Sequence, residues 1–251
     1  MRSIPEIPMR LVPAVTSAEM AAVDQAMVED YGIDLIQMME NAGRALAAFA
    51  RDRFLDGDPK GKTVVVLAGP GGNGGGALVA ARRLHGWGAT MRTILAQEPN
   101  RFAPVPAKQL AILHRLGVEV FSSGQVAAPP DSPTPDLVID GVIGYSLRGA
   151  PHGVAEALIR WSASAGAPIL ALDVPSGMDA TSGEIHGSTV QATATLALAL
   201  PKTALVSHGA GAYVGELYLA DIGVPRRLYS EINLPDPGIL FAKSDLVRLT
   251  V

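Results

Sequence analysis

Short apolar runs alternate with longer stretches of helical periodicity along most of this chain. A short run that is apolar throughout predicts a strand buried on both faces, because such a strand has no polar side. The predicted strands are residues 63–68, 91–95, 118–121, 137–140, 168–173, 189–200 and 213–221. The predicted helices are residues 35–54, 77–87, 105–116 and 153–164, with an earlier one that carries Met20, Val23 and Met27. This alternation predicts an α/β fold with a mostly parallel central sheet and helices on both faces.

The chain is expected to form one domain over residues 1–251. Thr16-Ser17-Ala18-Glu19 is a capping box that opens the first helix, and the two N-terminal helices are expected to pack on the sheet. Residues 122–135 are rich in Ser, Pro and Ala, and they predict a surface connection because the α/β alternation resumes after them. The core is expected at about 15–225, and residues 226–251 are expected to be a loosely attached C-terminal tail.

A glycine-rich run, residues 69–76, separates the first long strand from the helix that follows it. Glycines let the backbone approach a phosphate, and the first amides of a helix point toward it with the positive end of the dipole. The spacing differs from the G-x-G-x-x-G dinucleotide fingerprint, and no Gly-Lys-Ser/Thr follows as in a P-loop. The run therefore indicates an anion site of another type, with an ordinary tight turn as the alternative.

Polar residues follow three of the predicted strands. They are Asn73 in the glycine run, Asp140 with the loop 144–150 after it, and Asp173 with Ser176. Because ligands of such sheets bind outside the carboxyl ends of the strands, these segments are expected to converge. Two carboxylates, an amide oxygen and a hydroxyl suit a cation, and they also suit acid–base chemistry if one carboxylate is buried.

Each of these residues also has an ordinary structural interpretation. Asp140 or Asp173 could cap the turn that follows its strand, and Asn73 could be tolerated for its left-handed backbone. Ser176 could be a turn residue, and Lys202 could be a solvated lysine at a strand end.

Composition and charge narrow the class of protein. Of the 251 residues, 48% are hydrophobic and 18% are charged, which is enough apolar material for a sizeable core. The net charge of −4 argues against a general nucleic-acid binder, and the absence of cysteine excludes disulfides and thiol nucleophiles. The first residues lack the apolar core of a signal peptide, so a cytoplasmic protein is expected. The histidines show no metal-binding spacing and are expected at the surface: His85, His114, His152, His186 and His208.

Taken together, these motifs resemble the YjeF amino-terminal domain family, the NAD(P)H-hydrate epimerases. The family pattern has a Met-Glu-Asn-Ala-Gly helix, a G-x-G-N-N-G-G-D-G loop running into L-V-A-A-R, an acid-ended strand followed by G-T-G-L-x-G, a D-x-P-S-G turn and a Pro-Lys pair. The matching segments here are Met39 to Gly43, Gly69 to Arg82, Asp140 with Gly144 to Gly149, Asp173 to Gly177, and Pro201-Lys202. The resemblance covers roughly residues 15 to 225.

The resemblance implies a Rossmann-like three-layer sandwich and an epimerase that interconverts the R and S forms of hydrated NADH and NADPH, a metabolite-repair reaction. It implies Asp173 as the general acid/base and a K⁺ ion held by Asn73, Asp140 and Ser176. The implied partners are the hydrated dinucleotide, a separate NAD(P)H-hydrate dehydratase and a second copy in a homodimer, with no nucleic acid, no membrane and no fused dehydratase domain. The implied substrate-binding residues are Gly72, Asn73, Gly74, Gly75, Gly76, Gly144, Tyr145, Ser146, Leu147, Arg148, Gly149, Ala150 and Asp173.

The chain departs from the family pattern in its glycine run. Gly72 stands where the family has its first Asn, Gly76 where it has Asp, and Tyr145-Ser146 where it has Thr-Gly. These departures support the alternative of a non-catalytic nucleotide-binding or scaffold domain with the same fold. A nicotinamide dehydrogenase is disfavoured, because the phosphate loop has the wrong spacing.

Overall fold

The computed structural model describes residues 4–122 and 134–250, and the described part contains a nine-stranded sheet in the order β1-β9-β8-β7-β6-β5-β2-β3-β4. Neighbouring strands are parallel except β8 and β9, which are antiparallel. The strands are β1 (Glu6–Pro8), β2 (Thr63–Ala68), β3 (Thr90–Leu95), β4 (Glu119–Phe121), β5 (Leu137–Gly141), β6 (Ile169–Leu172), β7 (Ala194–Leu198), β8 (Glu216–Ala220) and β9 (Leu246–Thr250). The α/β, Rossmann-like prediction is confirmed.

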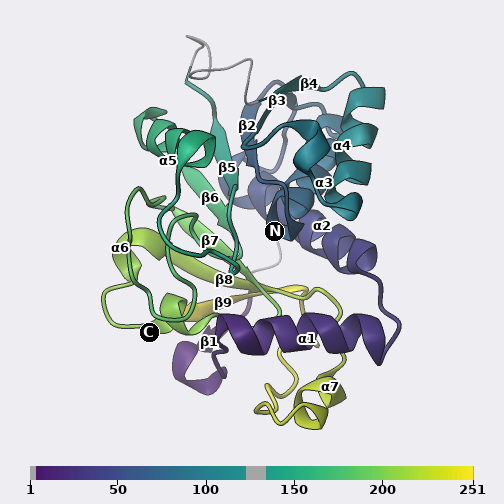
Figure 1. The fold of residues 1–251 in the computed structure, drawn as a ribbon, viewed down its shortest axis with the longest axis vertical. Coiled ribbons are helices and arrows are strands. Elements are labelled where there is room, and N and C mark those ends of the chain that lie inside the picture. Colours follow the sequence, from purple (N-terminus) through teal and green to yellow (C-terminus); the bar gives the residue numbers. More distant parts are fainter. Residues whose placement is uncertain (1–3, 123–133, 251) are drawn as a thin grey trace.

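Helices cover both faces of this sheet (Figure 1). The α-helices are α1 (Ser17–Glu29), α2 (Leu35–Phe54), α3 (Gly72–Gly86), α4 (Pro104–Arg115), α5 (Gly153–Ser164), α6 (Gly211–Val214) and α7 (Arg226–Glu231). Short 3-10 turns are η1 (Met9–Leu11), η2 (Pro99–Arg101) and η3 (Thr203–Val206). None of the described helices combines the length and the apolar character needed to cross a bilayer.

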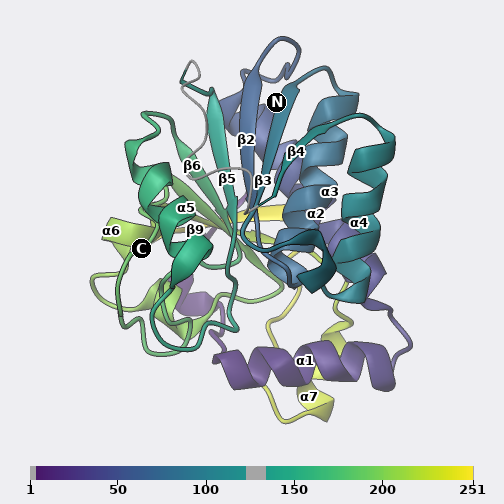
Figure 2. The same ribbon diagram turned by 45° about the horizontal axis from the view of Figure 1, so that its top comes forward.

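The central strands are buried on both sides, which explains their unbroken apolar sequence. Along β2, Val64 and Val66 pack in one core with α2 and α3, whereas Val65 and Leu67 pack in another core with α5. Figure 2 shows α2, α3 and α4 gathered on one side of the strands and α5 on the other. The sheet is therefore the middle layer of three, as the sequence predicts.

The strand order reverses beside β2, and this reversal determines where a site can form. β3 and β4 lie to one side of β2, and β5 to β8 lie to the other. Leu67 of β2 is in register with Asp140 of β5, and Asp140 is in register with Ala171 of β6. The loops after these strands consequently open at one edge, which α1 crosses in Figure 1.

The third helix begins earlier than predicted. Its first residue is Gly72, not Ala77, so most of the glycine run forms the opening turns of α3. The reason is close packing, which overrides the low helix propensity of glycine. A Cβ on Gly74 would lie 1.8 Å from the Gly69 carbonyl oxygen, and one on Gly75 would lie 2.5 Å from the Met39 sulfur.

The prediction of a loosely attached tail is wrong. Residues 226–251 contain α7 and β9, and β9 is inserted in the sheet between β8 and β1. The short strand β1 was not predicted, because three residues carry no periodic signal. The predicted strand 189–200 shrinks to Ala194–Leu198, and the predicted strand 213–221 begins at Glu216 after the turn α6. Most of the predicted connection 122–135 lies outside the described residues.

Candidate functional site

A cleft of about 650 Å³ opens at the carboxyl ends of the central strands, where the sequence places the polar segments. Its walls come from α1, α2, the first turn of α3, the loop after β5 and the ends of β6 and β7. The apolar side chains on these walls include Val28, Leu35, Met38, Met39, Leu198 and Ile222, and the polar ones include Asp24, Asn73, Tyr145, Ser146 and Asp173. The cleft can therefore take a ligand with an apolar ring and a polar remainder.

Asp140 and Ser176 form a buried pair beneath the cleft wall. Both are fully buried, and the Ser176 hydroxyl donates to Asp140 Oδ1 at 2.6 Å while the Ser176 amide donates to Oδ2 at 2.8 Å. The Val142 amide also donates to Oδ1, and the Ile143 amide donates to Ser176 Oγ. Burial raises the pKa of Asp140 to about 6, although these hydrogen bonds oppose the shift. The pair fixes the loop after β5 to the turn after β6.

The side-chain amide of Asn73 is buried but makes no hydrogen bond to the described part of the protein. Both its amide oxygen and its amide nitrogen are buried without a hydrogen-bond partner in the described part of the chain. It lies in the first turn of α3 against Gly144, where a Cβ would be 3.2 Å from the Asn73 Cβ and Cγ. An orphaned buried amide is rare in native structures, so the amide oxygen and nitrogen of Asn73 are available to a water, a ligand or an ion.

The side chains that could hold a cation at this end of the sheet offer oxygen atoms. Within residues 4–122 and 134–250, no group of three or more His, Cys, Asp or Glu side chains is arranged to hold a metal ion. Asn73, Asp140 and Ser176 instead offer an amide oxygen, a carboxylate and a hydroxyl, a donor set that suits a hard cation.

Asp173 forms an ion pair with Lys202 at the floor of the cleft. The Lys202 ammonium donates to Asp173 Oδ1 and also to the carbonyls of Leu198 and Leu200, at 3.1 and 3.4 Å. The Leu198 amide donates to the same carboxylate oxygen. Within the described chain, Asp173 Oδ2 accepts no hydrogen bond, so it is free to face a ligand.

Burial distinguishes this pair from an ordinary surface contact. The side chains of Lys202 and Asp173 are only 1% and 4% exposed, so the interpretation of Lys202 as a solvated lysine is wrong. Asp173 also has a φ of 65°, in the left-handed region that Asp and Asn tolerate better than most residues. The signal in the sequence was Pro201-Lys202 at the end of an apolar strand, which alone does not reveal the burial.

Asp24 is a cleft residue that the sequence analysis missed. It lies on α1, and the Tyr145 hydroxyl donates to its Oδ2 at 2.6 Å. The Tyr145 ring lies 5.7 Å from the Lys202 nitrogen, so Asp24, Tyr145, Lys202 and Asp173 form a continuous row. Burial raises the pKa of Asp24, and burial together with Asp24 raises the pKa of the Tyr145 hydroxyl. No local signal marks Asp24, because only the tertiary fold brings α1 to the loop after β5.

The raised pKa of Asp24 predicts a specific pH effect on stability. A carboxyl whose pKa is higher in the folded state stabilises the fold while protonated, and this contribution is lost as pH rises through the folded pKa. Asp24→Asn cannot ionise and can still accept from Tyr145. We therefore expect the difference in melting temperature, Asp24→Asn minus wild type, to be more positive at pH 7 than at pH 4. Parallel melting curves across this range would contradict the assignment.

The other predicted site residues divide into two groups. Gly72, Gly74, Gly144 and Ser146 line the cleft with Asn73, Tyr145 and Asp173. The remaining ones do not line it: Gly75, Gly76, Leu147, Arg148, Gly149 and Ala150. The prediction that Gly75 and Gly76 contact the substrate directly is not supported, because they pack inside the protein. A Cβ on Gly76 would lie 2.9 Å from Leu172 Cδ2, so an acidic side chain there would enter the apolar core.

The sequence of this chain is similar to those of known proteins. Residues 35–204 match the family model described as "YjeF-related protein N-terminus". The chain is 39% identical to an NAD(P)H-hydrate epimerase of Dehalogenimonas lykanthroporepellens, over 95% of this chain and 94% of that protein. It is 33% identical to the bifunctional NAD(P)H-hydrate repair enzyme Nnr of Moorella thermoacetica, over 85% of this chain but only 41% of that protein.

A solved structure shares the same fold. The crystal structure of the yeast protein ynu0 superposes with a TM-score of 0.78, covering 95% of this chain and 100% of that one. The sequence identity is 24%, so this likeness concerns the fold alone.

Proposed function

The chain belongs to the YjeF-related N-terminal family, and we propose from this membership that it is an NAD(P)H-hydrate epimerase. The proposed reaction interconverts the R and S forms of hydrated NADH and NADPH at C6 of the dihydronicotinamide ring. The relative that matches over nearly its whole length carries this name. The bifunctional relatives are more than twice as long as the region that they share with this chain, and we propose that a dehydratase consumes one of the two epimers.

The observation that supports the chemistry most is that Asp173, which lines the cleft, forms a buried ion pair with Lys202 behind it. Lys202 holds one carboxylate oxygen and leaves the other without a protein partner, so Asp173 has a fixed oxygen for proton transfer. In the proposed reaction Asp173 either passes a proton to the C6 hydroxyl, which leaves as water before water adds to the other face, or assists opening of the ring at the N1–C6 bond, which then forms again on the other face. The apolar walls around it suit the nicotinamide ring.

The substrate's charged end would lie at the start of α3. Gly71 and Gly72 are exposed, and nothing lies within 4 Å of a Cβ built on either, so a ligand can approach their backbone closely. The first amides of α3 then face a pyrophosphate with the positive end of the helix dipole. This arrangement favours a dinucleotide over a smaller neutral ligand.

A K⁺ ion held by Asn73, Asp140 and Ser176 is part of the proposal. The orphaned Asn73 amide supports it, as do the carboxylate of Asp140 and the hydroxyl of Ser176, which are hard-oxygen donors. When bound, the ion would offset the charge of Asp140 and add positive charge beside the start of α3. The role of this chain's residues is to hold the loop after β5 against α3.

Potassium should stabilise the protein through Asn73. A ligand that binds the folded state raises stability by RT ln(1 + [L]/Kd), about 2.7 kcal/mol at a hundred times Kd. We expect the wild type to melt at a higher temperature in KCl than in equimolar tetramethylammonium chloride, and Asn73→Ala to lose this difference. Asn100→Ala, at an exposed site, is the matched control. Identical wild-type melting temperatures in both salts would argue against a bound ion.

A two-phase assay tests the proposed activity. Mixed hydrates of NADPH are given to a purified dehydratase that accepts one epimer, and consumption then stops with the other epimer left. We expect addition of this protein to restart consumption until the substrate is exhausted. If consumption stays halted while the protein still binds the hydrate, the non-catalytic nucleotide-binding alternative is favoured. A homodimer and a cytoplasmic location stay predictions from the sequence.

A further inference from the structure

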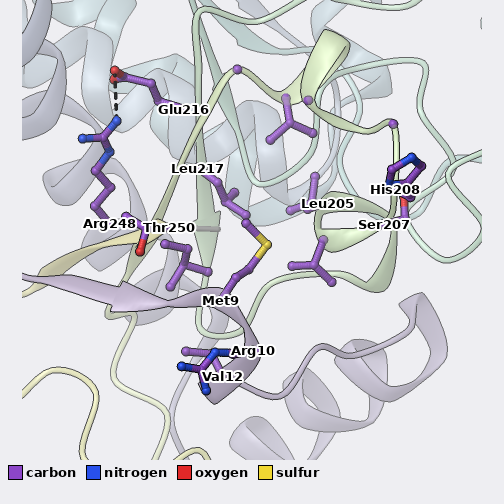
Figure 3. Close-up of a pocket in the computed structure, with 16 residues that line it drawn as sticks. Met9, Arg10, Val12, Leu205, Ser207, His208, Glu216, Leu217, Arg248 and Thr250 are labelled. Atoms are coloured by element: carbon purple, nitrogen blue, oxygen red, sulfur yellow. Dashed lines mark hydrogen bonds and ion pairs between the residues drawn. The ribbon is translucent and has the colours of Figure 1, made fainter.

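A second cavity, of about 960 Å³, lies away from the cleft and shares no lining residue with it. It is bounded by η1, by the segment from Leu205 to Gly215, and by β8 and β9 (Figure 3). Gly215 and Glu216 stand at the amino end of β8, whereas the cleft opens at the carboxyl ends of the central strands. The two cavities therefore belong to opposite ends of the sheet.

The interior of this second cavity is aliphatic. Figure 3 shows Met9, Leu205 and Leu217 projecting into the same space. Val12, Leu205, Val214, Leu217 and Leu249 are buried side chains of the surrounding core. No Phe, Tyr or Trp side chain lines it within the described part of the chain, and the imidazole ring of His208 stands at the rim rather than in the interior. Flexible hydrocarbon is the complementary ligand surface.

The rim of the cavity carries three side chains with nitrogen donors, two of which are arginines. Arg10, His208 and Arg248 reach it from three separate segments, and Figure 3 shows His208 and Arg248 on opposite sides. Arg10 and His208 are exposed, and neither has a hydrogen bond or an ion pair within residues 4–122 and 134–250. Their donors are available to a ligand.

The one acid on the rim, Glu216, does not reverse this charge. It accepts from Arg53 at 3.2 Å, from Arg248 at 3.4 Å and from the Tyr218 hydroxyl at 3.0 Å. Arg248 also pairs with Glu6 at 3.2 Å, so Arg53 and Arg248 are balanced by two carboxylates, and among the described rim residues Arg10 is the arginine without an ion pair. Ser207 and Thr250 add hydroxyl groups to the rim. An anionic group fits this rim, and a cationic one does not.

We propose that this cavity is a second binding site, for a small amphipathic carboxylate with an aliphatic chain. The chain would lie on Met9, Leu205 and Leu217, and the carboxylate would lie at the rim beside Arg10. An aliphatic interior with a few convergent polar groups is the usual composition of a small-molecule site. The volume lies within the range of ligand pockets, so a chain of about ten carbons can enter without unfolding the core.

Isothermal titration calorimetry on the full chain tests this proposal with decanoate, decanol and butyrate as probes. We expect decanoate to bind at one site per chain and decanol to bind about tenfold more weakly, because decanol lacks the charge. Butyrate should bind at least about 10³-fold more weakly, because it lacks six buried methylene groups. Arg10→Gln should weaken decanoate about fivefold and leave decanol unchanged. Arg115→Gln, at another exposed arginine far along the chain, should change neither.

Met9→Glu provides a second variant, since it places a negative charge on the aliphatic interior and should abolish decanoate binding. A thermal melt would first establish that this variant is folded. Equal affinities for decanoate and decanol, or for the wild type and Arg10→Gln, would overturn the proposal. Competition by saturating NADPH would place the carboxylate in the cleft and overturn it as well. A third result would also overturn the proposal: the wild type fails to bind decanoate and is a dimer, and Met9→Glu converts it to a monomer. In that case a second copy of the chain would cover the cavity.

Discussion

Asp173→Asn should lower epimerase turnover by about 10²- to 10⁴-fold, the usual contribution of a positioned general acid or base. An amide has nearly the shape of a carboxylate but cannot transfer the proton. Asparagine also tolerates the positive φ of 65° at this position, so the backbone should not change. The measurement is kcat and KM in the two-phase assay, with KM expected to stay within a few fold of the wild type.

Asp56→Asn is the matched control for this experiment. Asp56 also has a positive φ, 55°, and it also pairs with a lysine, Lys62, but its side chain is 83% exposed and far from the cleft. We expect this variant to keep full activity. If Asp173→Asn kept more than about half of wild-type turnover, the proton transfer would belong to another group, with Asp24 as the nearest candidate in the row.

Lys202→Met should destabilise the fold by about 3–5 kcal/mol, because it leaves the Asp173 carboxylate buried without its counter-ion. The side chain of Lys202 is 1% exposed, and its three donor contacts all lie inside the protein. Methionine fills a similar volume, so the loss should come from the missing charge and hydrogen bonds. Urea unfolding curves measure the change in the free energy of unfolding.

A double-mutant cycle separates the ion pair from simple packing. Asp173→Asn combined with Lys202→Met should be less destabilised than Lys202→Met alone, because no uncompensated carboxylate remains. Lys62→Met removes an exposed pair and should leave stability nearly unchanged. If the double variant is as unstable as the sum of the two single variants, the pair contributes no coupling energy and Lys202 acts through its carbonyl contacts.

Much of the fold could be predicted because its signals are local. The unbroken apolar runs of β2 and β5 mark strands covered on both faces, and helical spacing marks α2 and α5. The failures occurred where packing decides the structure. The start of α3 at Gly72 depends on the close approach of Gly74 to Gly69 and of Gly75 to Met39, and β9 is a strand because β8 and β1 lie on either side of it.

The sequence by itself determined which segments carry the chemistry of the cleft. Asn73, Asp140 and Asp173 each follow an apolar strand, and parallel strands bring their carboxyl ends to one edge of the sheet. What only the tertiary structure decided is how those residues are paired and exposed. Lys202 is buried against Asp173, Asp24 meets Tyr145 from a distant helix, and Gly76 turns inward to Leu172. These are contacts between segments far apart in the chain, and their burial depends on how the layers pack, which no local pattern of residues records.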